Sequence, residues 1–328
     1  MIGILTGLGK AGLARLGAGR YPLAVSWEVT RRCTRRCEYC DSWRGEQAEL
    51  ATDESLAVVD DLVSSGTRFL SLTGGEPLLR GDLPLIVDRA AAGGIRVGVS
   101  TNGDLLPERL TELSRLDHVV LSLDGGPDVQ DRLRGKGAYR ATIRAAEAAL
   151  AADVSVEFTA VLSTESLDCV EEVLDVARRL GVRVTFQPAY ARLLRSRSRN
   201  PLAPGGTRYR ALMAQLAERK RGGEAAIANS VSALEYLAGF PGPEPIACAG
   251  GRLFLRILSD GRVEICGIGR DRPLVGVDIR DGLRRAMARL RPPRCDACWC
   301  ARRTEVNLAW CGRLDALRRG YGRSEGRL

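Results

Sequence analysis

Six short apolar segments, separated by stretches with helical periodicity, are the feature that most restricts the fold of this chain. The segments are rich in β-branched residues and have the length of strands, while the intervening stretches repeat apolar residues at helical spacing. Such alternation is typical of a parallel sheet built from βα units, with helices covering both of its faces. The predicted strands are residues 23–29, 68–73, 95–100, 118–123, 154–161 and 182–187.

Helices are predicted in the gaps between these strands, and the pattern changes after residue 190. Gly181 follows the fifth predicted helix and is expected to be its C-cap. After the last predicted strand, residues 191–206 are polar and rich in arginine. Residues 253–266 then predict a β-hairpin that turns at Asp260 and Gly261. The predicted helices are residues 53–65, 84–92, 107–116, 139–152, 168–180, 208–221, 230–238 and 281–290.

Composition places the chain among soluble globular enzymes. Its 328 residues exceed the usual size of one hydrophobic core, so we expect one large domain with an appended piece. Hydrophobic residues make up 45% and charged residues 27%, and no run approaches the roughly 20 apolar residues that cross a bilayer. No basic segment precedes the apolar start, which argues against a secretory signal and predicts a cytoplasmic protein.

The net charge of +9 comes mostly from arginines clustered at 191–200 and 312–328. A solvated arginine-rich surface is the favoured interpretation, with attraction of phosphate-rich partners as the alternative. No aromatic residues alternate with the arginines, so specific binding of nucleic acid is not expected.

Cys33, Cys37 and Cys40 follow the first predicted strand, at the end where α/β folds collect their functional residues. Thiolates favour zinc or iron–sulfur clusters, and structural zinc takes four ligands. The sequence offers no fourth ligand nearby, because the one histidine, His118, lies at a predicted strand and is expected to be a packed residue. A [4Fe–4S] cluster on three cysteines instead leaves one iron open to a substrate or cofactor.

The Cys-x3-Cys-x2-Cys spacing, with Tyr39 before the last cysteine, closely resembles the motif of the radical SAM superfamily. The resemblance implies a partial (β/α)6 TIM-type barrel over about residues 22–190. It implies that the open iron chelates S-adenosylmethionine (SAM), and that an electron from the cluster cleaves SAM to a 5′-deoxyadenosyl radical, which takes a hydrogen atom from substrate. By the same resemblance Tyr39 lies near the adenine.

Polar clusters at the ends of later strands agree with this resemblance. They are "TGGEP" (73–77), "STNG" (100–103), "SLDG" (122–125), "DRLRG" (131–135) and "FQPAY" (186–190). The glycines allow close backbone approach to a ligand, Glu76 can accept from an ammonium group, and the hydroxyl, amide and carboxylate groups suit ribose and the methionyl end. Arg134 matches an arginine that pairs with the SAM carboxylate. The predicted cofactor-binding residues are Tyr39, Gly74, Gly75, Glu76, Ser100, Asn102, Ser122, Asp124, Arg134 and Gln187.

A competing dinucleotide-binding motif, "GLGKAG" at 7–12, lacks the context that such a motif needs. About nine residues with two further glycines separate it from Pro22, which leaves no room for a helix to present its N-terminus to a pyrophosphate. Residues 1–21 are therefore interpreted as an N-terminal lead-in.

The C-terminal third of the chain carries a second group of cysteines. Cys248 and Cys266 flank the predicted hairpin, and Cys295 and Cys298 form a C-x2-C, so these four can form one site for iron–sulfur or zinc. The spacing from Cys248 through Gly261 to Cys266 is similar to SPASM and twitch domains, and this resemblance implies one auxiliary [4Fe–4S] cluster.

Cys300 and Cys311 do not match the spacing of the full SPASM pattern, so a second auxiliary cluster is not expected. They are interpreted as extra or replacement ligands or as free thiols, and Cys169 as a core or surface residue. The predicted domains are the barrel with its following helices at 22–240, the auxiliary module at 241–315 and a basic tail at 316–328.

These residues predict a radical SAM oxidoreductase or maturase that oxidises, dehydrogenates or cross-links a peptide, sugar, lipid or cofactor precursor. The alternative is a non-catalytic iron–sulfur scaffold or electron carrier that retains the barrel. A flavodoxin or ferredoxin is the expected electron donor. Because few residues precede the first strand, a peptide substrate is expected to need a separate recognition protein or to bind without a leader. No catalytic acid or base can be assigned from the sequence.

Overall fold

One eight-stranded sheet forms the centre of the computed structural model, which describes residues 14, 19–44, 48–242, 244–267, 277–291 and 295–316. The strand order is β6-β5-β4-β3-β2-β1-β7-β8, and the first six strands of the chain are parallel neighbours in this sheet. All six predicted strands are confirmed. Their bounds are β1 Ala24–Thr30, β2 Phe69–Gly74, β3 Arg96–Thr101, β4 His118–Ser122, β5 Ser155–Leu162 and β6 Arg183–Pro188.

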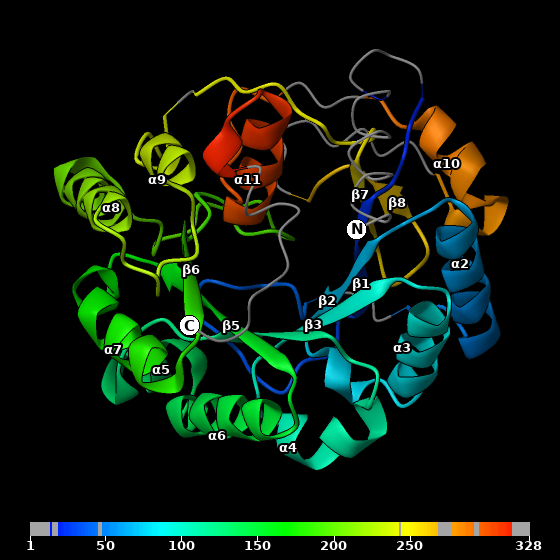
Figure 1. Ribbon diagram of the computed structural model, residues 1–328, viewed down its shortest axis with the longest axis horizontal. Coiled ribbons are helices and arrows are strands. Elements are labelled where there is room, and N and C mark those ends of the chain that lie inside the picture. The colour runs from blue at the N-terminus through cyan, green and yellow to red at the C-terminus, as the bar shows by residue number, and fades with distance from the viewer. Residues whose placement is uncertain are drawn as a thin grey trace.

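The sheet curves into an unclosed barrel whose convex side is covered by helices (Figure 1). The predicted helices are found, although the second half of 107–116 and the start of 168–180 are short 3-10 turns. Helix α5 was not predicted, and Gly181 ends α7 in a left-handed conformation, as expected. The barrel helices are α2 Thr52–Ser64, α3 Leu83–Ala92, α4 Leu106–Arg109, α5 Pro127–Arg134, α6 Ala138–Ala151 and α7 Val170–Leu180.

The two faces of the sheet differ in polarity. Val25 and Trp27 on β1 are fully buried in the apolar core that the helices share. Ser26, between them in the chain, pairs in register with Ser71 of β2, and both are only half-buried on the opposite face. The prediction that both faces are covered apolar surfaces therefore holds for the convex face alone, because the concave face lines the interior of an open barrel.

The C-terminal segment joins the barrel wall. The predicted hairpin is confirmed, with β7 Phe254–Ile257 parallel to β1 and β8 Val263–Glu264 antiparallel to β7. Arg31, at the end of β1, binds Glu28 at 2.8 Å and lies 3.8 Å from Asp260 of the hairpin. The boundary at residue 241 stays a prediction, and most of segments 1–21 and 316–328 lie outside the described residues.

Four further helices complete the described fold: α8 Gly206–Arg221, α9 Val231–Leu237, α10 Leu283–Arg289 and α11 Ala301–Trp310. Helices α9 and α10 fall within predicted helices, α8 begins two residues before the predicted helix 208–221, and α11 was not predicted. Helix α11 lies on the concave side of the sheet (Figure 1), where Arg302 donates to Glu157 of β5 at 2.9 Å. The cysteine-rich end of the chain thus reaches into the barrel.

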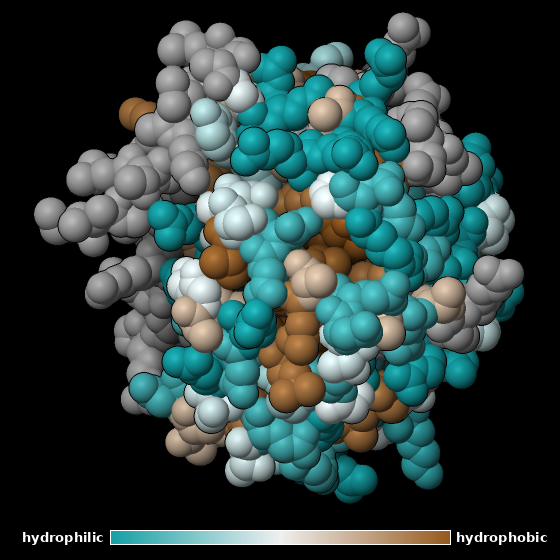
Figure 2. All heavy atoms as spheres, turned by 90° about the vertical axis from the view of Figure 1, so that its right-hand side faces the viewer, coloured by the Kyte–Doolittle hydropathy of each residue, from teal (hydrophilic) through white to brown (hydrophobic). Residues whose placement is uncertain are grey.

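One face of the molecule is mainly hydrophilic at its surface (Figure 2). Figure 2 shows the side of the molecule that carries α2 and α10, where hydrophilic side chains surround a hollow in which hydrophobic residues are visible. Among the residues that the structure describes, no helix combines the length and apolar character needed to span a membrane.

Candidate active site

The three cysteines of the Cys-x3-Cys-x2-Cys motif lie in the segment 31–44, which follows β1 and is named here the cysteine loop. The Cys40 amide donates to the Cys37 carbonyl at 3.1 Å, and the Cys33 sulfur accepts from the Arg35 amide at 3.5 Å. Burial raises the pKa of the Cys33 thiol and raises that of Cys37 to about 11. Without a bound metal these thiols stay protonated at neutral pH, as expected for ligands that lose their protons on metal binding.

Gly74 and Gly75 hold the backbone of β2 against the start of the cysteine loop. A Cβ atom at Gly74 would lie 2.0 Å from the Thr30 carbonyl oxygen, and one at Gly75 would lie 2.2 Å from that of Arg32. The Gly75 and Glu76 amides donate to these two carbonyls at 2.9 and 2.7 Å. The close approach that these glycines permit is therefore to the protein's own backbone.

Glu76 is fully buried and accepts three hydrogen bonds. They come from the Thr101 hydroxyl at 2.8 Å, the Asn102 amide at 2.9 Å and the Leu78 amide at 3.2 Å. Burial raises the pKa of the Glu76 carboxyl to about 7, against the lowering effect of these bonds. Glu76 thus joins the ends of β2 and β3 and would gain from a cationic partner.

The end of β3 is tied directly to the cysteine loop. The Asn102 side-chain amide donates to the Thr34 hydroxyl at 2.9 Å and lies 3.9 Å from the Cys33 sulfur. Asp104 accepts from the Thr34 hydroxyl at 2.8 Å and from Arg35 Nε at 3.1 Å. The sequence analysis predicted Asn102 at this site but did not predict the Arg35–Asp104 ion pair. Arg35 lies within the three-cysteine motif, and Asp104 directly follows "STNG" (100–103).

Tyr39, Asp124 and Arg134 form one buried group on the other side of the cysteine loop. Arg134 donates to the two Asp124 oxygens through Nε at 2.6 Å and Nη2 at 3.1 Å, and the Tyr39 hydroxyl also donates to Asp124. The Arg134 guanidinium lies 5.3 Å from the centroid of the Tyr39 ring. Burial and the neighbouring Asp124 charge raise the pKa of Tyr39 well above its usual value. Tyr39 is therefore a neutral donor at every relevant pH.

Ser100, Ser122 and Gln187 are half-buried at the carboxyl ends of β3, β4 and β6. The Ser122 carbonyl accepts from Gln130 and Thr142, which fixes the end of β4. The structure therefore brings all predicted cofactor-binding residues to the carboxyl ends of neighbouring parallel strands or to the loops and helix that follow them.

His118 occupies the first position of β4, the opposite end of that strand from the cysteine loop. Its Nδ1 lies 3.1 Å from the Ser155 hydroxyl, and burial lowers its pKa to about 4. It is a neutral packed residue, in line with the sequence-based interpretation.

Asp41, next to Cys40, was missed by the sequence analysis. It is buried and accepts from the backbone amides of Arg195 at 2.9 Å and Ser196 at 2.7 Å. The arginine-rich segment 191–200, expected to be a solvated surface, is thus anchored by its backbone to the cysteine loop. The one sequence signal for this contact was the position of Asp41, a carboxylate directly after the last cysteine of the motif.

Comparison with known proteins identifies the family. Residues 27–177 match the model of the radical SAM superfamily. The PqqA peptide cyclase of Ruegeria pomeroyi is 30% identical over 269 residues, which cover 78% of this chain and 71% of that protein. The chain belongs to the radical SAM superfamily. It is an enzyme, and the superfamily's cofactors, a [4Fe–4S] cluster and SAM, are its cofactors.

Other relatives match a smaller part of this radical SAM enzyme. Fe-coproporphyrin III synthase of Methanosarcina barkeri is 36% identical over 139 residues, which cover 40% of this chain and 35% of that protein. Mycofactocin maturase MftC of Mycolicibacterium smegmatis is 32% identical, with 50% of this chain and 44% of the maturase covered. The chain therefore spans about a third of the first relative and less than half of the second.

Solved structures agree on the fold. Streptococcus suis SuiB bound to precursor peptide SuiA has a TM-score of 0.63 at 15% identity, covering 80% of this chain and 64% of SuiB. Native anSMEcpe with bound AdoMet has a TM-score of 0.64 at 18% identity, covering 82% and 81%. At such identities the likeness shows a shared partial barrel and nothing about substrate.

The C-terminal cysteines gather around the hairpin and the start of α11. Cys248 and Cys266 pack at the edge of the main core, while Cys298 and Cys300 directly precede α11. Across the described residues, no group of three or more cysteine, histidine or carboxylate side chains meets in metal-binding geometry. Thiols are nevertheless the donor type that iron–sulfur clusters require, so both groups of cysteines fit such clusters in chemistry.

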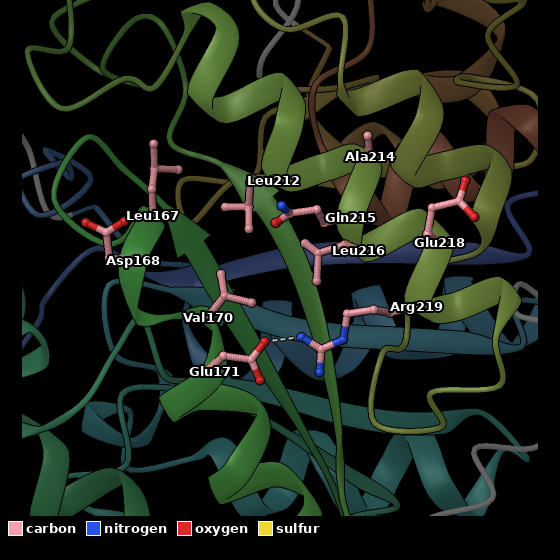
Figure 3. Close-up of a pocket in the computed structure, with 10 residues that line it drawn as sticks. All are labelled: Leu167, Asp168, Val170, Glu171, Leu212, Ala214, Gln215, Leu216, Glu218 and Arg219. Carbon is pink, nitrogen blue, oxygen red and sulfur yellow. Dashed lines mark hydrogen bonds and ion pairs between the residues drawn. The ribbon is translucent and has the colours of Figure 1, made fainter.

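A separate cavity of about 640 Å³ lies between α7 and α8, away from these residues (Figure 3). Leu167 and Val170 face Leu212 and Leu216 across it, and the Glu171–Arg219 ion pair crosses one end. None of its lining residues belongs to the predicted site, so the cavity is not a candidate active site.

Proposed function

We propose that this chain cleaves SAM reductively and abstracts a hydrogen atom from a peptide substrate. The observation that carries the proposal is the match to a peptide cyclase over 269 residues, more than the barrel alone can supply. The matches to Fe-coproporphyrin III synthase and to AdoMet-dependent heme synthase cover only 40% and 49% of the chain. A peptide is therefore the substrate class that the longer similarity supports.

In this proposal Cys33, Cys37 and Cys40 hold the cluster, with one iron open for SAM. The bound cluster and SAM would supply the 5′-deoxyadenosyl radical that takes hydrogen from the substrate. The three cysteines lie in one short loop, where the Glu76 amide donates to the Arg32 carbonyl and the Asn102 side chain donates to the Thr34 hydroxyl. This rigid support favours a single orientation of the ligands, which catalytic metal sites require.

Glu76 and Arg134 are proposed to bind the two ends of the methionyl group. Glu76 is a buried carboxylate, and an ammonium group would favour its ionised form. Arg134 uses Nε and Nη2 for Asp124, so a cofactor carboxylate would be met by Nη1. Tyr39 and Gln187 are proposed to border the adenine, with Ser100, Asn102, Ser122 and Asp124 near the ribose and the methionyl end, as the resemblance implies.

The C-terminal cysteines are proposed to hold one auxiliary [4Fe–4S] cluster, which gives about eight irons per chain. Such a cluster can accept the electron left after hydrogen abstraction, which suits dehydrogenation or cross-linking. A flavodoxin or ferredoxin is proposed as the donor of the electron that starts the reaction.

The proposal is tested with anaerobically reconstituted protein, SAM and dithionite. The wild-type chain should form 5′-deoxyadenosine, and the Cys33→Ala/Cys37→Ala/Cys40→Ala variant should form none while it keeps the C-terminal iron. Cys169→Ala, which removes a cysteine outside both groups, serves as the control and should retain activity. A wild-type chain that holds iron but never cleaves SAM would favour the scaffold alternative.

The substrate class is tested separately. Short peptides encoded beside the gene, and Fe-coproporphyrin III as the comparison compound, are added to the same reaction. A peptide should raise 5′-deoxyadenosine formation above the substrate-free rate and should itself lose hydrogen by mass spectrometry. Stimulation by the porphyrin and by none of the peptides would contradict a peptide substrate.

A further inference from the structure

The arginines of the cysteine loop are of two kinds. Three of them are neutralised by carboxylates, in the pairs Arg31–Glu28, Arg32–Glu49 and Arg35–Asp104. The other two, Arg36 and Arg44, are exposed, and neither forms an ion pair with any residue that the structure describes. The loop therefore presents two positive charges to its surroundings.

Arg36 and Arg44 share one aromatic ring. The Arg36 guanidinium carbon lies 4.4 Å from the centroid of the Trp43 ring, and that of Arg44 lies 4.9 Å from it. A guanidinium group is attracted to the face of an indole ring, which holds the charge in place without neutralising it. The three side chains are named here the arginine–tryptophan patch.

The arginine–tryptophan patch is hydrogen-bonded to the backbone of two cysteines. Arg36 Nη1 donates to the Cys33 carbonyl at 2.8 Å, and Trp43 Nε1 donates to the Cys40 carbonyl at 3.1 Å. Trp43 itself is half-buried between the surface and the loop. An electron that arrives at the patch thus has one hydrogen bond and a few covalent bonds to cross before it reaches a cysteine.

The charge of the arginine–tryptophan patch restricts the kind of partner. Within residues 31–44, Glu38 is the one exposed carboxylate, and the whole chain has a net charge of +9. Opposite charges on two protein surfaces accelerate association and fix its orientation. Tryptophan and arginine are also the side chains that most often dominate contacts between proteins. A protein with surface carboxylates is therefore complementary to the patch.

We propose that the arginine–tryptophan patch docks the acidic one-electron carrier protein that reduces the cluster of the cysteine loop. The proposal rests on the proposed function, because it requires a cluster on Cys33, Cys37 and Cys40. The reduced carrier gives up one electron and the oxidised cluster gains it, with no bond made or broken and no proton transferred. Contacts between electron carriers are small, often below about 1,200 Å² of buried surface, so one loop can supply much of the contact.

Binding is measured by calorimetry on the reconstituted chain, with an oxidised flavodoxin and an oxidised [2Fe–2S] ferredoxin of negative net charge in separate titrations. Arg36→Gln/Arg44→Gln should weaken binding of at least one carrier roughly tenfold and reduce its dependence on salt. Arg115→Gln/Arg179→Gln is the charge-matched control and should bind like the parent. These two arginines are exposed, form no ion pair among the described residues, and precede β4 and β6 at the other end of the sheet.

Electron delivery is measured with the same two carriers in their reduced forms. For each chain, the rate of 5′-deoxyadenosine formation with the carrier is divided by the rate with dithionite, a small reductant that needs no docking surface. This ratio should fall roughly tenfold in Arg36→Gln/Arg44→Gln and recover in Arg36→Lys/Arg44→Lys, which keeps both charges. The wild-type rate with dithionite tests SAM cleavage itself, so a wrong surface and a wrong reaction give different results.

Unchanged binding and an unchanged ratio in Arg36→Gln/Arg44→Gln would overturn the proposal, because the electron would then enter elsewhere on the chain. An equal loss in the Arg115→Gln/Arg179→Gln control would also overturn it, since net charge would then be the cause. A raised KM for a stimulating peptide, with normal carrier binding, would assign the patch to the substrate instead.

Arg36→Gln also removes the bond to the Cys33 carbonyl, so iron content is measured for every variant. Where the double variant fails to hold its iron, Arg44→Gln alone takes its place. No hydrogen bond from the Arg44 side chain to a cysteine is found among the described residues. The single variant should lower the ratio severalfold, and a ratio equal to that of the parent would overturn the proposal.

Discussion

The two groups of cysteines are held in place in different ways. Cys33, Cys37 and Cys40 occupy eight consecutive residues, and backbone and ionic contacts from β2, β3 and segment 191–200 fix their loop. The C-terminal thiols come from both sides of a hairpin and from the start of α11. The first group lies in one loop that contacts the sheet, whereas the second combines two cysteines beside the hairpin, which pack against the main core, with cysteines at the start of α11.

This difference should affect how strongly cluster binding is coupled to local folding in the two groups of cysteines. The contacts that place the cysteine loop involve backbone atoms of the barrel, which folds around its own large core. The C-terminal cysteines come from separate segments of the chain, so metal binding there should contribute more to local folding. Substitutions at the strand ends should therefore reduce mainly the iron bound by the three-cysteine motif. Substitutions around α11 should reduce mainly the iron of the proposed auxiliary cluster.

Among these variants, Gly75→Ala should have the largest effect, and it should act on the cysteine loop alone. The added methyl group would lie 2.2 Å from the Arg32 carbonyl oxygen and would push the cysteine loop off β2. We expect iron to fall from about eight to about four per chain and 5′-deoxyadenosine formation to be lost. Gly81→Ala is the control, because a Cβ at Gly81 meets nothing within 4 Å. Full activity in Gly75→Ala would mean that the loop tolerates displacement.

Asp124→Ala should be the next most damaging change. It leaves the Arg134 guanidinium buried without its bidentate partner, which typically costs about 3–5 kcal/mol. Chemical denaturation should show this loss in the free energy of unfolding. Asp168→Ala, which breaks an exposed ion pair with Arg208, should change the stability little. An equal loss of stability in both variants would show that the buried Arg134–Asp124 pair contributes no more to folding than the exposed Arg208–Asp168 pair.

Glu76 should give the stability of the chain a dependence on pH. Its pKa is raised by burial from 4.5 to about 7, so between these values the folded chain binds more protons than the unfolded chain. Stability should therefore fall by about 3 kcal/mol as pH rises through this window, relative to Glu76→Gln. Denaturation of both chains across this range measures the difference, and bound SAM should reduce it. Parallel pH profiles would show that Glu76 stays ionised.

Asp41→Ala should have the smallest effect. It removes the acceptor for the Arg195 and Ser196 amides and should release segment 191–200 from the cysteine loop. Burial tends to raise the Asp41 pKa, but these bonds outweigh it and hold the pKa below its usual value. We expect trypsin to cut this arginine-rich segment several times faster, with little loss of overall stability. An unchanged cleavage rate would show that the anchor lies elsewhere.

Much of the barrel could be predicted because its signals are local. Each of the six strands is a short apolar run between helices, and period alone separates the two kinds of element. The cofactor-binding residues follow the same logic, since parallel strands bring their carboxyl ends to one edge and polar motifs directly after them must meet there. The polarity of the concave face was misjudged, because period-two polarity within an apolar run is weak evidence of an open barrel.

The sequence by itself determined the strands of the barrel and the family motif, because these depend on spacing within a few residues. Only the tertiary structure decided which residues support them. The Arg35–Asp104 and Asp41–Ser196 contacts join points 69 and 155 residues apart, and the contact of Asn307 with the Cys298 sulfur depends on the docking of an unpredicted helix. Such pairings depend on how elements pack in space, and neither periodicity nor the spacing of a motif records that packing.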